Sequence, residues 1–169
     1  MAAFPDFQLL SAIHLDYWRF TADQVKKALG GSVNLKDISN TCAIRMSHAM
    51  NFSGHKIPVK WGSVTNRESK AGYRYIIRVV NFREWMLQTF GEPTIQIRKK
   101  AGEALDRRKL QGRRGVIGME ISFGDADGHF DLWHLDTFSA ESSSGANYLT
   151  QATSVQLWSN GVRISEAEF

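Results

Sequence analysis

The only cysteine of this 169-residue chain, Cys42, lies at the start of a segment that predicts a helix. Asn40 and Thr41 are favourable N-cap residues, and the residues after them are good helix formers, with Ala43 and Met46 on one apolar face. A thiol in the first helical turn faces the positive end of the helix dipole, which favours the nucleophilic thiolate. A lone cysteine is also a common small buried hydrophobe, so nucleophilic catalysis requires a base elsewhere in the chain.

His129 is the best placed of the five histidines to act as that base. It begins a predicted strand directly after a glycine-rich turn, where a rigid frame holds a side chain near the surface. His48 falls on roughly the opposite face of the predicted helix from the cysteine, and His134 faces the other side of the strand from His129. His14 and His55 have no such frame, and we interpret both as ordinary surface or internally satisfied histidines.

A third residue is needed to accept a hydrogen bond from the second ring nitrogen of the base. If the chain turns tightly at Leu135, Glu141 lies opposite His129 on the returning strand, within about 5.5 Å. Asp131 shares a face with His129 but is displaced by about 7 Å along the strand. The weaker candidates for this position are Asn147, Asp136 and Asp131.

Four segments predict the helical part of the fold. Residues 4–20 are apolar and aromatic, which indicates an arm packed on the core with a turn or more of helix. A capping box at residues 21–24 opens a helix through Leu29, and two glycines end it. The cysteine helix is expected to run to about residue 51. A third helix, residues 82–90, is capped by Asn81 and carries an apolar stripe that predicts a core face.

Five segments predict strands, and the connections between them carry strong turn signals. The strands are expected at residues 73–79, 115–123, 129–133, a short stretch ending at Ser139, and 154–158. Residues 59–71 and 142–145 are interpreted as loops, and residues 124–128 as the turn of a hairpin. The sequence therefore predicts one α+β domain over residues 1–169, in which the cysteine helix packs on an antiparallel sheet.

Charge and hydropathy limit the other functions that the chain could have. The net charge is +4, and eight basic residues fall between residues 98 and 114. This basic segment indicates either a solvated face or a surface for an acidic partner or nucleic acid. A nucleic-acid-binding module is thus the alternative of a different class, but the segment lacks the interleaved aromatic residues of a stacking platform.

The same sequence features bear on membranes, export and metals. No apolar run approaches the roughly 20 residues that span a bilayer, and the N-terminus lacks the basic region of a signal peptide. We therefore expect synthesis in a reducing cytosol and no membrane insertion. Asp125 and Asp127 fit a calcium loop poorly, because the other ligands of that motif are missing, and no metal or cofactor is predicted.

Two sequence blocks resemble a known family. The block from Asn40 to Gly54 (NTCAIRMSHAMNFSG) and the block Gly128–Trp133 (GHFDLW) are similar to the fourth family of type VI secretion amidase effectors. The resemblance runs from about Phe20 to Trp158. It implies a papain-like, NlpC/P60-type α+β fold and hydrolysis of the D-glutamyl to diaminopimelate bond in peptidoglycan stem peptides.

The resemblance also implies partners and a site. The partners are a peptidoglycan stem peptide, a tube or spike component of the type VI apparatus and a cognate immunity protein, with action in the periplasm of the target cell. The site it implies has Cys42 as nucleophile and His129 as base and then acid. The hairpin geometry above adds Glu141 as the orienting residue, and the proposed mechanism adds the Cys42 backbone N–H as the oxyanion donor. The family's aspartate about eleven residues after the histidine is Ala140 here. A papain-like hydrolase or transferase acting on another amide is the alternative within the same class.

Overall fold

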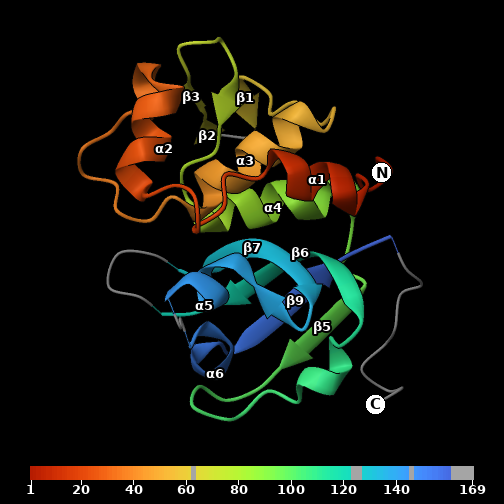
Figure 1. The fold of residues 1–169 in the computed structure, drawn as a ribbon. Helices are drawn as coiled ribbons and strands as arrows, with labels where there is room; N and C mark the ends of the chain where they lie inside the picture. Colours follow the sequence, from red (N-terminus) through yellow and green to blue (C-terminus); the bar gives the residue numbers. More distant parts are fainter. Residues whose placement is uncertain (62–63, 123–126, 145–146, 161–169) are drawn as a thin grey trace.

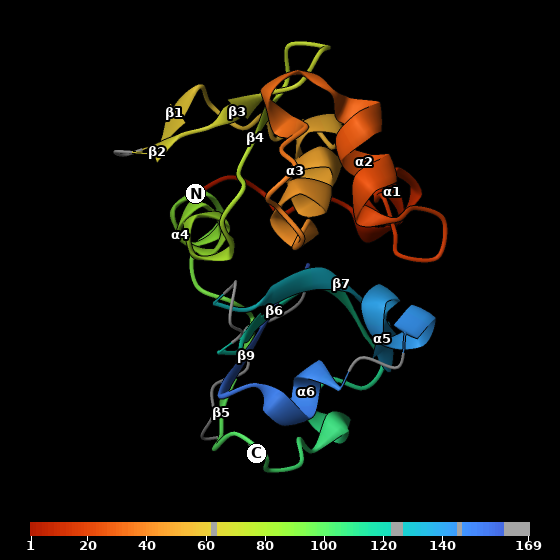
Figure 2. The ribbon, with the colours of Figure 1, turned by 90° about the vertical axis from the view of Figure 1, so that its left-hand side faces the viewer.

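The computed structural model describes residues 1–61, 64–122, 127–144 and 147–160. Four helices, α1 to α4, lie on one side of a five-stranded antiparallel sheet, and the short helices α5 and α6 lie on the other (Figures 1 and 2). The α+β class and the antiparallel sheet are therefore confirmed. The helices are α1 (Phe7–Ile13), α2 (Ala22–Leu29), α3 (Cys42–Phe52), α4 (Val79–Phe90), α5 (Ser139–Ser144) and α6 (Tyr148–Gln151).

The sheet has the strand order β5-β9-β6-β7-β8, with every neighbouring pair antiparallel. Its strands are β5 (Ile95–Arg98), β6 (Arg113–Glu120), β7 (His129–Leu135), β8 (Thr137–Phe138) and β9 (Ser154–Trp158). The predicted hairpin is thus formed by β6 and β7, and the predicted last strand is β9. Gly118 faces Phe130 across this hairpin, and a Cβ added at Gly118 would come within 2.7 Å of the Phe130 ring.

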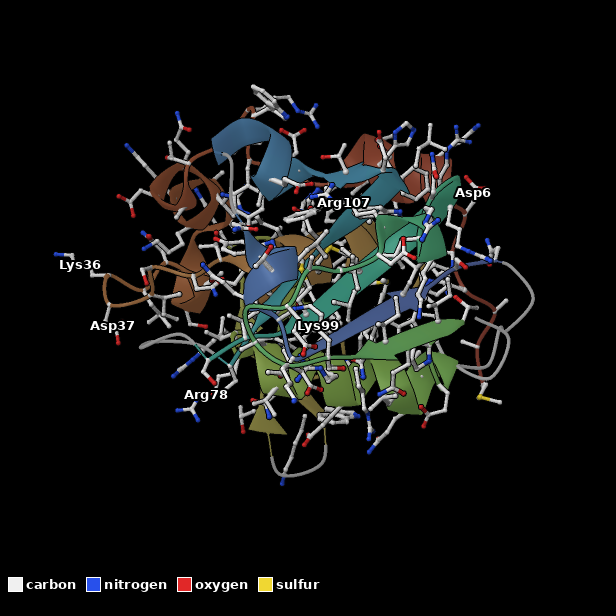
Figure 3. The ribbon with its side chains drawn as sticks, turned by 90° about the horizontal axis from the view of Figure 1, so that it is seen from below. Asp6, Lys36, Asp37, Arg78, Lys99 and Arg107 are labelled. Carbon is white, nitrogen blue, oxygen red and sulfur yellow. The ribbon has the colours of Figure 1, made fainter. Side chains whose placement is uncertain are left out.

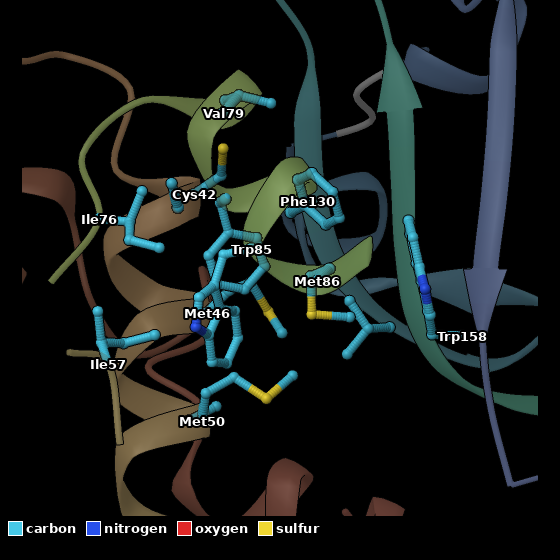
Figure 4. Packing of buried hydrophobic residues seen from close by; sticks show 14 of the residues in the cluster. Cys42, Met46, Met50, Ile57, Ile76, Val79, Trp85, Met86, Phe130 and Trp158 are labelled. Carbon is cyan, nitrogen blue, oxygen red and sulfur yellow. The ribbon is translucent and has the colours of Figure 1, made fainter. Parts of the chain in front are cut away.

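The core occupies both faces of the sheet. Alternation along β7 directs Phe130 and Leu132 toward a cluster formed by α1, α3 and α4, in which Cys42, Met46 and Met86 pack (Figure 4). Trp133 belongs to a second cluster on the other face, with residues of α6 and β5. Every residue of α3 except His48 and Phe52 is buried, so the helix that begins with the cysteine is a central element of the fold.

Helix α2 is the clearest case of a structure specified locally. The Thr21 hydroxyl accepts from the Gln24 N–H at 3.3 Å, and the Gln24 side chain accepts from the Thr21 N–H at 2.8 Å. Gly30 ends the helix at a positive φ of 60°. The predicted capping box and glycine stop are both confirmed.

Several predicted elements are wrong. Residues 59–71 are not only loop, because they contain β1 (Lys60–Trp61), β2 (Val64–Thr65) and β3 (Arg67–Glu68). The strand predicted at residues 73–79 is reduced to β4 (Arg74–Tyr75), and α4 starts at Val79 with Arg78 as its N-cap rather than Asn81. Val79 is buried in the core, and this burial outweighs the β propensity of its branched side chain.

Two predicted connections fall partly outside the described residues. Residues 124–126 of the predicted turn at 124–128 lie outside the described residues. Gly145 of the predicted 142–145 loop lies outside them as well. The part of that loop which is described, residues 142–144, belongs to α5 instead.

The basic segment is spread over β5, a 3-10 turn (Arg107–Lys109) and β6. Figure 3 shows Lys99 and Arg107 on the sheet side of the molecule, away from α1–α4. Arg107 pairs with Glu141, Arg108 pairs with Asp106 at 2.9 Å, and the Lys99 Nζ donates to the Thr150 carbonyl at 2.9 Å. Part of this positive charge is therefore engaged within the chain. None of the helices in the described part of the chain has the length and apolarity that crossing a bilayer requires.

Candidate active site

Cys42 begins α3 and is fully buried. Its side chain projects from the start of the helix toward Val79 (Figure 4). The side chain of Asn40 caps this end of the helix, because its Oδ1 accepts the Cys42 N–H at 3.0 Å. The Asn40 Nδ2 donates to the Gly128 carbonyl at 3.5 Å, which ties the start of α3 to the residue preceding His129. The Cys42 N–H is therefore already bonded in this structure, and its role as an oxyanion donor stays a prediction that requires this bond to break.

His129 lies at the start of β7, almost completely buried at 3% exposure. Its ring packs against Tyr148, with centroids 4.7 Å apart, and its Nε2 lies 3.5 Å from the Asp131 Oδ2. Burial lowers the pKa of His129, but hydrogen bonding to Asp131 and to Cys42 and the negative charges of both outweigh burial and raise the pKa to about 9. This environment favours the protonated ring of His129, close to the single thiol of the chain.

Asp131 is fully buried and is held from several sides. Its Oδ1 accepts the Leu132 N–H and its Oδ2 accepts the Ala140 N–H, both at 2.8 Å. Burial raises the pKa of Asp131, but the hydrogen bond with His129, the charges of His14 and His129 and the Ala140 N–H together hold it below its usual value. Asp131 is therefore the carboxylate that faces the imidazole of His129.

Glu141 is not beside His129, and the predicted hairpin register is wrong. β7 pairs with β8 through Trp133↔Phe138 and His134↔Thr137, after which the chain turns into α5. Glu141 lies in the first turn of that helix, where its carboxylate pairs with Arg107 and accepts from the Thr137 hydroxyl at 3.2 Å.

Of the three weaker candidates for the third position, only Asp131 is buried with His129. Asp136 and Asn147 are both exposed at the surface, where a side chain cannot orient a buried ring. Asp131 is within reach of His129 because neighbouring same-face side chains on a strand can lean toward one another. The displacement of about 7 Å along the strand that the sequence predicts refers to the backbone.

A buried arginine fastens the N-terminal arm to the cysteine helix. Arg45 is 1% exposed, and its guanidinium donates to the backbone carbonyls of Leu15, Asp16 (3.1 Å) and Phe20 (2.9 Å). It also lies 4.0 Å from the Tyr17 ring centroid. Arg45 was not predicted as part of the site, although a charged residue inside an apolar helix run is a signal that could have identified it.

The arm brings two further side chains to the site. The Tyr17 ring lies 5.7 Å from the His129 ring, and burial, then the negative charges of Cys42 and Asp131, raise the pKa of the phenol well above its usual value. His14 is 3% exposed, and its Nε2 lies 3.9 Å from the Asp131 Oδ1. Interpreting His14 as an ordinary surface or satisfied histidine was therefore wrong, because residues far apart in sequence place it at the site.

The remaining histidines lie elsewhere, as predicted for His48 and His134. His48 Nδ1 is 3.0 Å from the Tyr75 hydroxyl, and burial lowers the pKa of this histidine to about 4. His134 is exposed and stacks on Phe7. No group of three metal-ligating side chains occurs among the described residues. A thiol, an imidazolium and a buried carboxylate form a set that suits acyl transfer through a thioester.

The profile of one protein family matches residues 38–158, and its description is type VI secretion system (T6SS) amidase effector protein 4, or Tae4. The chain belongs to this family. Like other Tae4 proteins it is a type VI secretion amidase effector and hence a hydrolase. No protein in the curated sequence comparison matches the chain.

Solved Tae4 structures have the same fold. Tae4 of Salmonella Typhimurium, in complex with Tai4, is 22% identical with a TM-score of 0.78 over 93% of this chain and 99% of that chain. The Tae4–Tai4 complex of Enterobacter cloacae gives 24% identity and a TM-score of 0.73 over 93% and 99% of the two chains. Tae4 of Enterobacter cloacae alone gives 24% identity and a TM-score of 0.72 over 93% and 97%. The α+β architecture is therefore that of the family.

Proposed function

We propose that this Tae4-family chain is a cysteine peptidase that hydrolyses the D-glutamyl to diaminopimelate bond of peptidoglycan stem peptides. The observation that carries the proposal is the buried set of Cys42, His129 and Asp131 in a chain that belongs to an amidase effector family. Cys42 is the nucleophile, His129 the general base and acid, and Asp131 the residue that orients His129. Asp131 thus takes the role that the sequence analysis gave to Glu141.

The proposed reaction has two stages. His129 holds the proton of the Cys42 thiol, and the thiolate attacks the carbonyl carbon of the scissile amide. The tetrahedral intermediate collapses as the imidazolium gives its proton to the leaving amine, which breaks the C–N bond and leaves a thioester. His129 then takes a proton from water, the hydroxide attacks the thioester, and the thiolate leaves as the acid product departs. Asp131 stabilises the imidazolium in both stages.

The decisive experiment is mass spectrometry of purified stem-peptide fragments after incubation with the protein. We expect products that together gain one water, with a new carboxylate on D-glutamate and a new amine on diaminopimelate. Cys42→Ala should yield no product while its circular dichroism and melting temperature stay near wild type. Cleavage at a different amide would overturn the proposed bond, and full activity in Cys42→Ala would overturn the proposed nucleophile.

We further propose that an immunity protein binds this chain and that the type VI apparatus, through a tube or spike component, delivers it to the periplasm of a target cell. The support is that solved Tae4 proteins from two organisms are complexes with Tai4. An immunity protein that covers the site should protect Cys42 from alkylation at saturating concentration. An unchanged alkylation rate in the complex would place the immunity protein on another surface.

A further inference from the structure

A second imidazole faces the buried carboxylate of the site. His14 ends α1, where its N–H donates to the Leu10 carbonyl at 2.9 Å. This anchor directs the ring into the interior, and the side chain is 3% exposed. Its Nε2 has no hydrogen-bond partner in the described part of the chain, yet it lies 3.9 Å from the Asp131 Oδ1. A buried ring nitrogen without a closer partner needs an explanation, because burial without a hydrogen bond is costly.

Asp131 therefore lies between two histidines, with one oxygen toward each. The Oδ2 lies 3.5 Å from the His129 Nε2, and the Oδ1 lies 3.9 Å from the His14 Nε2. The backbone N–H groups of Leu132 and Ala140 each donate to one of the same oxygens. These four groups surround the carboxylate, and His14 is the only one of them on the N-terminal arm.

The charged groups around His14 come from three elements. β7 presents Asp131 and His129, α3 presents Arg45 and His48, and the arm itself presents Asp16. Burial lowers the pKa of His14, with Asp131 acting in the opposite sense and Arg45 in the same sense as burial. A neutral imidazole carries one N–H, and a proton on Nε2 makes His14 a donor toward Asp131.

We infer that His14 is a positioning residue, whose Nε2–H, 3.9 Å from the Asp131 Oδ1, acts electrostatically with the backbone donors to keep the carboxylate in the orientation that supports the His129 imidazolium. This inference rests on the proposed Cys42, His129 and Asp131 site, but it does not depend on which amide is cut. Without His14 the Oδ1 keeps only the Leu132 N–H among the described residues, so the carboxylate is held less firmly beside His129. The imidazolium then loses part of its negative neighbour and releases its proton at lower pH.

The test is a pH titration of the His129 ring, followed by ¹H–¹³C NMR of the histidine Cε1–H groups in the free protein. In wild type the midpoint is expected near the pKa of about 9. His14→Leu should lower this midpoint by about one unit or more, in the same direction as Asp131→Asn. His14→Gln offers an amide N–H near the position of Nε2 and should restore most of the wild-type midpoint. A wild-type midpoint in a folded His14→Leu protein, together with a lowered one in Asp131→Asn, would overturn the inference.

A second measurement needs no variant and covers the case in which His14→Leu does not fold. The ¹⁵N shifts of the His14 ring in wild type should show a neutral Nε2–H tautomer at pH 7. An Nδ1–H tautomer would overturn the inference, since Nε2 could then donate nothing to Asp131. Neither measurement uses a substrate, so failure to cleave peptidoglycan would refute the proposed function and leave the role of His14 to be judged by its own result.

Discussion

Asp131 supports the proposed chemistry indirectly, through His129. It touches no reacting atom, but it stabilises the positive charge of His129 from within a fully buried position. A charge there is tolerated only because N–H donors and imidazoles surround it. Glu141 is chemically similar, but its carboxylate forms an ion pair with Arg107. Environment, not residue type, separates the two carboxylates.

We therefore predict that Asp131→Asn lowers turnover by about a hundredfold or more, because the imidazolium loses its counter-charge while the shape of the side chain is kept. Glu141→Gln is the matched control and should leave turnover near wild type, since it alters only the contacts with Arg107 and Thr137. Steady-state cleavage of a stem peptide measures both. A hundredfold loss in Glu141→Gln with an active Asp131→Asn would reverse the assignment.

Burial of His48 should make the folded protein less stable at acidic pH. Its pKa is about 4 in the folded protein against 6.5 for a free histidine, with burial as the main cause. The unfolded chain therefore binds a proton that the folded chain does not, and the free energy of unfolding should fall as pH drops from 6.5 through about 4. Urea denaturation at pH 7 and pH 4.5 should show a smaller loss in His48→Gln than in wild type. The control is His134→Gln, because His134 is exposed. If His134→Gln reduced the loss of unfolding free energy between pH 7 and pH 4.5 as much as His48→Gln does, the role of His48 would be refuted.

His129 acts in the opposite direction on the alkaline side. Its folded pKa of about 9 exceeds the unfolded value of 6.5, so its stabilisation is complete below pH 6.5 and is lost as pH rises through about 9. His48 and His129 together predict a stability maximum near pH 6.5.

At the scale of elements, Arg45 connects the N-terminal arm to α3. Its buried guanidinium satisfies three carbonyls of residues 15–20, and its Nε donates to the Thr41 hydroxyl at 3.0 Å. Replacing the cation with an apolar side chain removes the guanidinium donor from all three carbonyls, of which only the Asp16 carbonyl keeps another donor in the described part of the chain, the Phe20 N–H at 3.2 Å.

We predict that Arg45→Met lowers the free energy of unfolding by about 3 kcal/mol or more, measured by urea denaturation. The control is Arg19→Met, because Arg19 also contacts Asp16 and the His14 carbonyl, but its side chain is 56% exposed. That exposed pair should be worth less than about 1 kcal/mol. Equal losses in the two variants would mean that Arg45 contributes no more than a surface charge.

The cap of α3 joins helix stability to the reactivity of the thiol. Asn40→Ala should cost about 1 kcal/mol and should also slow the reaction of Cys42 with iodoacetamide, because the tie to Gly128 is lost. Asp6→Ala is a matched cap deletion, since Asp6 accepts from the first turn of α1. It should cost a similar amount of stability but leave alkylation unchanged. An equal fall in the alkylation rate in both variants would refute a specific effect of the Asn40 tie, since loosening of the fold alone would expose the buried thiol and speed alkylation.

The elements predicted correctly from the sequence are those whose structure a local signal decides. α2 follows from its capping box and glycine stop, and α3 follows from its N-cap residues and helix-forming run. The β6–β7 hairpin follows from alternating residues on both sides of a glycine-rich turn. Cys42 and His129 were proposed in the same way, because each lies at the start of a locally predictable element.

The failures share a dependence on tertiary contacts or on unusual backbone geometry. Leu135 has a φ of 64°, which bulky side chains rarely adopt. The turn there pairs His134 with Thr137, whereas a tight turn centred on Leu135 would pair His134 with Asp136. Asp131 and His14 acquire their roles only when the arm packs against β7. Nothing in the residues around His14 signals the carboxylate that lies more than a hundred positions away.

At the scale of the whole molecule, the site forms where three parts of the chain meet. α3 brings Cys42, β7 brings His129 and Asp131, and the arm brings His14 and Tyr17. The two core clusters cover opposite faces of the sheet, so β7 is fixed from both sides. This arrangement holds the reacting groups in a rigid frame, but it also leaves the thiol with no exposed surface.

Full burial of Cys42 makes access to the sulfur a kinetic event of its own. Any molecule that reacts with the thiol must wait for a local opening, and a bulky reagent needs a wider opening than a small one. We predict that the ratio of alkylation rates between iodoacetamide and a bulky aryl maleimide is many times larger in the native protein than in the same chain in urea. Equal ratios in the two states would mean that the thiol is open in solution. For the proposed cleavage of stem peptides, the same opening would set a limit on turnover that no improvement of the catalytic groups could raise.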